Sequence, residues 1–358
     1  MKINVFVFIL TLTAIACSCS KRKASISALC EKDARNNYIL KWEIYPEPNE
    51  NSSLGIYSSP NDTIFLPSSL KTVKADDYIS IMESPLMVSR MFFRIKTDNT
   101  TSGVITNRFF KMDSVHNFRD IGGYYTEDGH QIRWGKIYRS GSLSRLSDRD
   151  KEEINKLGIK TILDLRSADS KRSFPQDLLD DKNYIRIPIG DDGYEFISPK
   201  IMENRFLRGD AIIFTQDTYR SFVDSYTDQF ARFFDYLCDR DSYPIVFNCY
   251  LGKDQTGIAT YLLLRALDVP VETAEEDYML SNAGIKRPLF VRGVEELSES
   301  KEEVIAMMSN TDLAFLRYGL SCIRKKYGSV DEYMDKGLKL TPEKRKMLQD
   351  IFLYEKSK

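Results

Sequence analysis

The segment that most constrains this chain places a cysteine between a buried strand and a helix. Pro244–Asn248 is a short apolar run that predicts a strand, and Thr256–Leu267 is a strongly apolar run that predicts a helix. Between them lie Cys249 and Gly252. A tight turn that joins a strand to a helix directs several backbone N–H groups and the positive end of the helix dipole at one point, which creates a site for an anion.

Cys249 at the mouth of such a site suits nucleophilic chemistry. The helix dipole and the amides favour the thiolate form, so the sulfur can act as a nucleophile near neutral pH. Gly252 allows the backbone to curve inward, and Lys253 supplies a point charge for a phosphate group. The same pattern also fits a buried structural cysteine, so this segment alone does not decide the function.

The sequence from residue 113 onward predicts an α/β domain with a mainly parallel sheet, because short β-branched runs alternate with helical ones. Thr218–Leu237 has aromatic residues at helical spacing and predicts a helix packed on the sheet, and Lys301–Lys358 is also helical. The candidate strands are Lys160–Leu165, Tyr184–Ile189 and Pro244–Asn248. We therefore expect one domain over residues 113–358.

Residues 24–112 show short alternating or β-branched runs separated by turns, which predicts an all-β domain. The runs are Tyr38–Tyr45, Met91–Lys96 and Val104–Phe110. An antiparallel sandwich of the immunoglobulin or fibronectin type is the expected fold. No residue in it suggests chemistry, so we expect a spacer or an interaction module.

Residues 1–16 have the pattern of a signal peptide, with Lys2 followed by an apolar run from Val5 to Leu12. The run is too short to span a membrane as a stable helix. Ala14–Cys17 resembles the lipobox of bacterial lipoproteins, in which the cysteine becomes the acylated first residue. We expect an exported protein of the bacterial cell envelope, lipid-anchored to a membrane at Cys17, with residues 17–23 as the linker. The alternative is a plain secretory signal cut near the same place.

Composition excludes several classes of function. A net charge of −1 argues against a nucleic-acid-binding surface. The histidines, His116 and His130, are too few and too isolated for a metal site, and no cofactor is implied. Beyond the N-terminal segment the cysteines are scattered and do not resemble a disulfide framework; they are Cys30, Cys238, Cys249 and Cys322.

Several short motifs resemble one family. Asn248–Gly257 resembles the HC-x-x-G-K-D-R-T-G loop of the bacterial atypical protein-tyrosine and dual-specificity phosphatases. The other matching stretches are Asn117–Tyr124, Tyr138–Leu143, Leu157–Ile159, Asp164–Ser167 and Tyr327–Val330. They follow the family's order over roughly residues 113 to 353. The resemblance implies a dual-specificity-phosphatase-like domain that acts on phosphorylated proteins or phosphoinositides.

The resemblance also implies roles for individual residues. Cys249 would attack phosphorus and form a cysteinyl phosphate, which water then hydrolyses. The acid that protonates the leaving oxygen is expected to be Asp254, with Asp191 or Asp192 as the alternative. The phosphate would be held by the rest of the loop, namely Tyr250, Leu251, Gly252, Lys253, Gln255, Thr256 and Gly257.

Two positions depart from the family's loop. Gln255 stands where the family has arginine, and Asn248 stands where it has histidine. A neutral amide cannot clamp two phosphoryl oxygens or neutralise their charge as a guanidinium does. Supporting positive charge is expected from Arg119, Arg139 and Arg166 in other matched motifs, although each of these arginines also suits a salt-bridged framework. Asp164 is a further candidate for a supporting role.

Three hypotheses follow. The first is a cysteine-type phosphoric monoester hydrolase weakened by Gln255. The second is a pseudophosphatase that binds phosphorylated ligands without turnover. The third is a lipoprotein whose sandwich domain mediates adhesion or assembly, with the α/β domain as support. An anion-directed loop favours the first two, and Gln255 moves the balance from the first toward the second.

Overall fold

The computed structural model describes residues 24–49, 51–85, 88, 90–168, 182–190, 194–285 and 297–355. The expected signal peptide, Cys17, Asp191 and Asp192 lie outside these ranges. Within them, no helix is long and apolar enough to cross a membrane.

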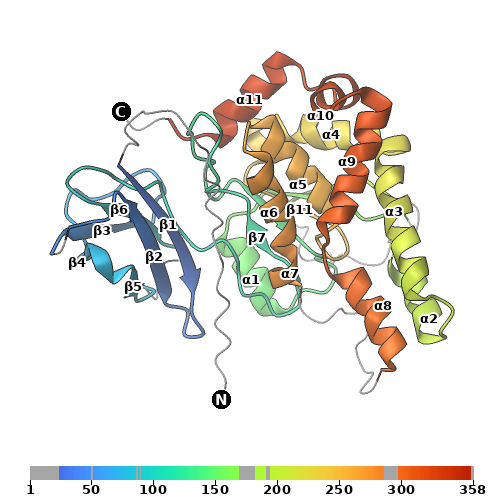
Figure 1. Ribbon diagram of the computed structural model, residues 1–358, viewed down its shortest axis with the longest axis horizontal. Coiled ribbons are helices and arrows are strands. Elements are labelled where there is room, and N and C mark those ends of the chain that lie inside the picture. The colour runs from blue at the N-terminus through green and yellow to red at the C-terminus, as the bar shows by residue number, and fades with distance from the viewer. Residues whose placement is uncertain are drawn as a thin grey trace.

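A five-stranded sheet forms the centre of the larger part of the chain, with helices on both faces (Figure 1). Its order is β10-β9-β11-β8-β7, and all neighbours are parallel except β7 and β8. The strands are β7 (Arg119–Asp120), β8 (Ile137–Ser140), β9 (Thr161–Asp164), β10 (Asn183–Arg186) and β11 (Ile245–Asn248). The prediction of an α/β domain with a mainly parallel sheet is confirmed.

The strand register brings polar residues together at one edge of this sheet. Asn248, the last residue of β11, is aligned with Ser140 of β8 on one side and with Asp164 of β9 on the other. The carboxyl ends of parallel strands are where ligands bind in open α/β sheets. The cysteine loop begins at this edge, directly after Asn248.

Helix α5 (Gln255–Ala266) follows the loop and is buried over most of its length. Helix α4 (Thr227–Leu237) packs on the sheet, and its Phe233 ring lies 5.0 Å from that of Phe247 in β11. The other helices are α1 (Asp148–Lys156), α2 (Tyr194–Met202), α3 (Arg208–Asp224), α6 (Val271–Met279), α7 (Ser281–Gly284), α8 (Glu299–Ser309), α9 (Leu313–Tyr327), α10 (Val330–Glu332) and α11 (Pro342–Phe352).

The prediction of a single helix over Thr218–Leu237 is wrong, because helix α3 ends at Asp224 and helix α4 begins at Thr227. The break brings the rings of Phe222 and Phe230 to 5.9 Å in edge contact. On one straight helix these residues would be about 12 Å apart along the axis. The continuous aromatic spacing therefore reflects two helices that share one core.

Two three-stranded antiparallel sheets precede the α/β domain (Figure 1). One contains β1 (Ser25–Lys32), β2 (Tyr38–Tyr45) and β5 (Ile79–Met82), and the other contains β3 (Ser53–Ser59), β4 (Lys71–Lys74) and β6 (Phe92–Lys96). Residues of both sheets, including Leu40 and Ile95, share one buried cluster.

The third run expected there as a strand, Val104–Phe110, forms only isolated bridges in the described structure. Ile105 pairs with Phe93 of β6, and four residues later Phe109 pairs with Arg119 of β7. The segment passes from one sheet to the other, so it pairs with each over too short a length to form a strand of its own.

A buried ion pair joins the N-terminal sheets to the α/β domain. The Arg90 guanidinium lies 2.6 Å from Asp120 of β7 and also donates to the Asn107 carbonyl at 2.8 Å. It stacks over the rings of Phe110 and Trp134. Burial opposes the charge on Arg90, but Asp120 raises the pKa of the guanidinium above its ordinary value. The two parts of the chain are thus linked by a charge pair withdrawn from water.

We predict that Arg90→Met lowers the free energy of unfolding by about 3 kcal/mol, because it leaves the buried Asp120 carboxylate without its cation. Lys41→Met, which breaks an exposed pair with Glu31, is the matched control and is expected to cost less than about 1 kcal/mol. Urea denaturation measures both. Equal losses for the two variants would contradict a structural role for the buried pair.

Candidate active site

Cys249 lies at the base of the loop between β11 and α5. Its side chain is 1% exposed, and its Sγ atom is 3.5 Å from the hydroxyl of Thr256 in the first turn of α5. Thr256 is fully buried. The thiol therefore has a polar neighbour on the helix that the loop leads into.

The loop presents unpaired backbone donors. Within the part of the chain that the structure describes, the N–H groups of Leu251, Gly252 and Lys253 have no hydrogen-bond acceptor, although these residues are buried. Buried backbone donors almost always have partners, and a run of free ones is typical of an anion-binding loop. Gly252 has a φ of +72°, and a Cβ there would lie 2.5 Å from the carbonyl carbon of Ser140. Only glycine fits this turn.

The Gly252 carbonyl is held from beneath by two donors. Asn117 Nδ2 lies 2.7 Å and Arg139 Nη2 lies 2.8 Å from this oxygen. In a trans peptide the carbonyl and the next N–H point in opposite directions. Fixing the Gly252 oxygen therefore also fixes the Lys253 N–H on the other side of the peptide, away from Arg139.

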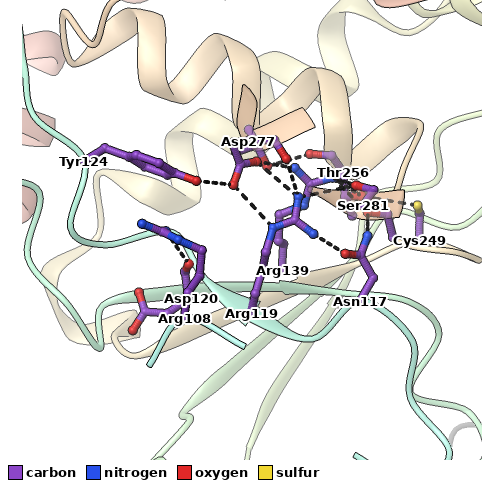
Figure 2. Close-up of polar contacts among 12 residues, drawn as sticks. Arg108, Asn117, Arg119, Asp120, Tyr124, Arg139, Cys249, Thr256, Asp277 and Ser281 are labelled. Carbon is purple, nitrogen blue, oxygen red and sulfur yellow. Dashed lines mark hydrogen bonds and ion pairs between the residues drawn. The ribbon is translucent and has the colours of Figure 1, made fainter. Parts of the chain in front are cut away.

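The two donors are themselves organised by one carboxylate, Asp277 of α6 (Figure 2). Asp277 is fully buried, and its oxygens lie 2.7 Å from Arg139 and 3.3 Å from Arg119. Arg119 Nη1 also donates to the side-chain oxygen of Asn117. Tyr124 adds a hydroxyl at 2.9 Å. The carboxylate thus positions both groups that hold the Gly252 carbonyl.

The charged side chains of this cluster shift one another's pKa values. Burial would raise the pKa of Asp277, but Arg119 and Arg139 hold it well below its usual range. Burial and the nearby Arg119 lower the pKa of Arg139 to about 10, against the opposing effect of Asp277. With two guanidinium groups and one carboxylate, the cluster carries one net positive charge beneath the loop.

A second carboxylate, Asp164 at the end of β9, orients Asn248. It accepts hydrogen bonds from Arg166 at 2.9 Å, from the Tyr184 hydroxyl at 2.7 Å and from Asn248 Nδ2 at 3.2 Å. Arg166 is therefore ion-paired framework, as are Arg119 and Arg139. All three arginines are paired with buried carboxylates, which is the arrangement that the framework alternative predicts.

Asp254 is buried, with 5% of its surface exposed. It occupies the N-cap position of α5, yet its side chain makes no capping hydrogen bond. One carboxylate oxygen instead accepts from Lys253 Nζ at 2.8 Å and from the Tyr219 hydroxyl at 3.1 Å. Asp254 is therefore neither a solvated loop residue nor a side-chain cap of α5.

Gln255 is half-buried, and its Nε2 donates to the Ile189 carbonyl at 3.1 Å. Ile189 follows β10 and lies two residues before Asp191. The side chain that replaces the family's arginine therefore ties the start of α5 to the segment after β10.

Several residues that shape this site were not predicted from sequence. They are Asp277, Tyr219 and Tyr278, and Asn117, which was noted only as part of a motif. One signal was available. Ala274, Asp277, Tyr278 and Ser281 are spaced as one face of a helix, and all four are buried. A carboxylate on an otherwise buried helix face requires a cationic partner.

The described residues include no group of three or more histidine, cysteine, aspartate or glutamate side chains placed to hold a metal ion. The polar groups of the cysteine loop and of the residues that support it are amides, hydroxyls, paired arginines and Lys253. The arrangement is suited to binding a tetrahedral anion above a thiol.

Comparisons with known proteins point to phosphatases. The sequence pattern that defines the tyrosine phosphatase family matches residues 110–354. A Cupriavidus necator protein that carries the name of a tyrosine-protein phosphatase is 27% identical over 237 residues, covering 64% of this chain and 83% of that protein. The triple specificity protein phosphatase PtpB of Mycobacterium tuberculosis is 27% identical over 225 residues, covering 57% of this chain and 77% of that protein.

Among solved structures, the core catalytic domain of the PP-IP phosphatase SIW14 from S. cerevisiae aligns with a TM-score of 0.28 and 12% identity. The alignment covers 58% of this chain and 93% of that chain.

We predict that Asp277→Asn lowers the free energy of unfolding by about 3 kcal/mol near pH 7, because the neutral amide leaves two buried guanidinium groups without their carboxylate. Asp335→Asn, which breaks an exposed pair with Arg345, is the control and is expected to lose less than about 1 kcal/mol. The pKa of Asp277 is lowered by folding, so its contribution is present above about pH 4 and is lost as the pH falls further.

The difference in unfolding free energy between wild type and Asp277→Asn is therefore expected to be smaller at about pH 3.5 than at about pH 7. Urea denaturation at the two pH values measures it. A difference that does not change with pH would show that Asp277 is not an ionised partner of the arginines in the folded protein.

Proposed function

This chain belongs to the tyrosine phosphatase family, and we propose that it is a phosphoric monoester hydrolase in which Cys249 is the nucleophile. The observation that carries the proposal is the buried loop whose free N–H groups, at Leu251, Gly252 and Lys253, follow the cysteine within the described structure. A loop with a purely structural role has no use for three consecutive buried donors without acceptors.

The reaction proceeds in two steps. The Cys249 thiolate attacks phosphorus, the S–P bond forms as the P–O ester bond breaks, and Asp254 gives its proton to the leaving oxygen. A water molecule then attacks phosphorus, the S–P bond breaks, and Asp254 takes up the proton of the water. The loop amides stabilise the charge on the phosphoryl oxygens in both transition states.

Charge neutralisation is the weak point of this site. Gln255 offers no charge, and its amide is engaged with the Ile189 carbonyl. By analogy with arginine residues in phosphoryl transfer, the missing guanidinium costs about 10³ to 10⁵ in rate. Lys253 and the net positive charge of the Arg119, Arg139 and Asp277 cluster compensate in part. We therefore propose an active but slow enzyme.

A pseudophosphatase that binds phosphorylated ligands without turnover is the second candidate. The engagement of Gln255 with the Ile189 carbonyl favours it, because the amide is not free to contact a phosphoryl oxygen in this arrangement. The adhesion or assembly role is less well supported, since it gives the free loop amides no ligand.

The proposed substrates are phosphorylated protein side chains or phosphoinositides. The Mycobacterium tuberculosis relative is named for triple specificity, which supports a site open to more than one kind of phosphate ester. Lys253 suits a highly charged substrate of either kind.

We propose that the protein is exported to the bacterial cell envelope and lipid-anchored at Cys17, with the immunoglobulin- or fibronectin-like N-terminal sheets as a spacer or interaction module. The resemblance of Ala14–Cys17 to a lipobox supports the anchor.

The prediction is that Cys17→Ser abolishes incorporation of a labelled fatty acid when the full chain is expressed in a bacterium. Cys322→Ser is the control and is expected to incorporate as much label as the wild type. Label retained by Cys17→Ser would contradict the anchor.

We predict that the protein without residues 1–16 slowly hydrolyses 4-nitrophenyl phosphate and that Cys249→Ser abolishes this activity, because the hydroxyl is a far weaker nucleophile. Gln255→Arg is expected to raise kcat/KM at least about tenfold, since it restores the guanidinium. Steady-state kinetics measure both effects.

Gln255→Met serves as the matched control. It also frees the Ile189 carbonyl but adds no charge, so it is expected to give no gain. An equal gain in Gln255→Met would assign the effect to the lost tether rather than to charge. Phosphate binding with no Cys249-dependent turnover in wild type or Gln255→Arg would favour the pseudophosphatase.

A further inference from the structure

A chain of three buried hydroxyl and carboxyl groups runs from α6 through α3 to the loop. The Tyr278 and Tyr219 hydroxyls lie 2.8 Å apart, and the Tyr219 hydroxyl lies 3.1 Å from Asp254 Oδ1. Tyr219 and Tyr278 are fully buried, and Asp254 is nearly so. Three segments far apart in the sequence therefore converge on the carboxylate to which the reaction above assigns the proton.

The hydrogen bonds of this chain have a direction. Tyr219 donates its single hydroxyl proton to Asp254 Oδ1. That oxygen can accept it whether Asp254 is ionised or carries the transferable proton on its other oxygen. Tyr219 can then only accept from Tyr278, which gives its own proton to Tyr219. Burial raises the pKa of both phenols well above the ordinary value, so both remain neutral donors over the pH range of an assay.

Two glycines determine where the tyrosine rings lie. A Cβ at Gly257, in the first turn of α5, would lie 2.9 Å from the Tyr278 ring. A Cβ at Gly319 of α9 would lie 2.9 Å from the Tyr219 ring. Each ring thus packs directly against a helix backbone. Such contact restricts the rings, and with them the hydroxyls, to one position.

The same carboxylate oxygen also accepts from Lys253 Nζ at 2.8 Å. A phosphate in the loop competes for this ammonium group, because Lys253 lies within the same turn. The Tyr219 hydroxyl comes from outside the loop and keeps its place when Lys253 turns to a ligand. It is therefore the contact that can define the orientation of Asp254 in both states.

We propose that Tyr219 is a positioning residue that holds Asp254 in the orientation required for proton transfer to the leaving oxygen, and that Tyr278 holds Tyr219. This inference rests on the proposed phosphatase function. It assigns a role in the reaction to α3, a helix that has no residue in the cysteine loop.

The test compares substrates that differ in their need for an acid. 4-Nitrophenyl phosphate has an acidic leaving phenol that departs with little help, whereas phenyl phosphate requires protonation of its leaving oxygen. We expect Tyr219→Phe to lower kcat/KM for phenyl phosphate at least about tenfold and for 4-nitrophenyl phosphate less than about threefold. Tyr278→Phe is expected to shift the ratio in the same direction by a smaller factor.

Asp254→Asn provides the reference. It is expected to lower kcat/KM more for phenyl phosphate than for 4-nitrophenyl phosphate, as Tyr219→Phe does, but by a larger factor. Once Asp254 is replaced, the Tyr219 hydroxyl has no acid to position, so Tyr219→Phe should have no further effect on phenyl phosphate. Tyr243→Phe is the matched structural control. It removes a buried hydroxyl that donates to the Leu237 carbonyl, away from the loop.

Tyr243→Phe is expected to leave the ratio of the two substrates unchanged. Equal slowing of both substrates by Tyr219→Phe, or the same change of ratio in Tyr243→Phe, would overturn the inference while leaving the phosphatase function intact. Additive losses of kcat/KM for phenyl phosphate in the variant that combines Tyr219→Phe with Asp254→Asn would also overturn it. Absence of any Cys249-dependent hydrolysis in wild type would overturn the proposed function and this inference together.

Discussion

The site depends on one buried carboxylate. Asp277 is paired with Arg139 and Arg119, and through Arg139 and Asn117 it determines where the Gly252 carbonyl points. Because a peptide plane is rigid, holding that oxygen on one side places the next N–H on the other. The anion-directed turn is therefore maintained by charge pairing within the protein core.

The two-residue strand β7 connects this cluster to the rest of the molecule. Successive side chains of a strand point to opposite faces. Arg119 reaches Asp277 beneath the cysteine loop, and its neighbour Asp120 binds Arg90 at the boundary with the N-terminal sheets. Figure 2 shows the two residues side by side, with Arg119 directed toward Asp277. Adjacent residues of β7 therefore contact the N-terminal part of the chain and the cluster that supports the loop.

Motif and periodicity predicted much of this organisation. The apolar run before Cys249 is β11, the apolar run after the loop is α5, and the alternation of strands and helices predicted the mainly parallel sheet. The continuous aromatic spacing of 218–237 was misleading, because Phe222 and Phe230 belong to two helices that meet. Val104–Phe110 was misleading for a related reason: Ile105 pairs with β6 and Phe109 pairs with β7, which belong to different sheets.

The sequence by itself determined the loop, its proposed nucleophile and its departures from the family, because these lie within ten consecutive residues with a recognisable spacing. Only the tertiary structure decided which groups surround that loop. Asp277 is 25 residues from Gly252 along the chain and Tyr219 is 35 residues from Asp254, and neither has a local motif. Such contacts arise from packing of helices on a sheet, where side-chain direction and burial select partners that sequence spacing does not reveal.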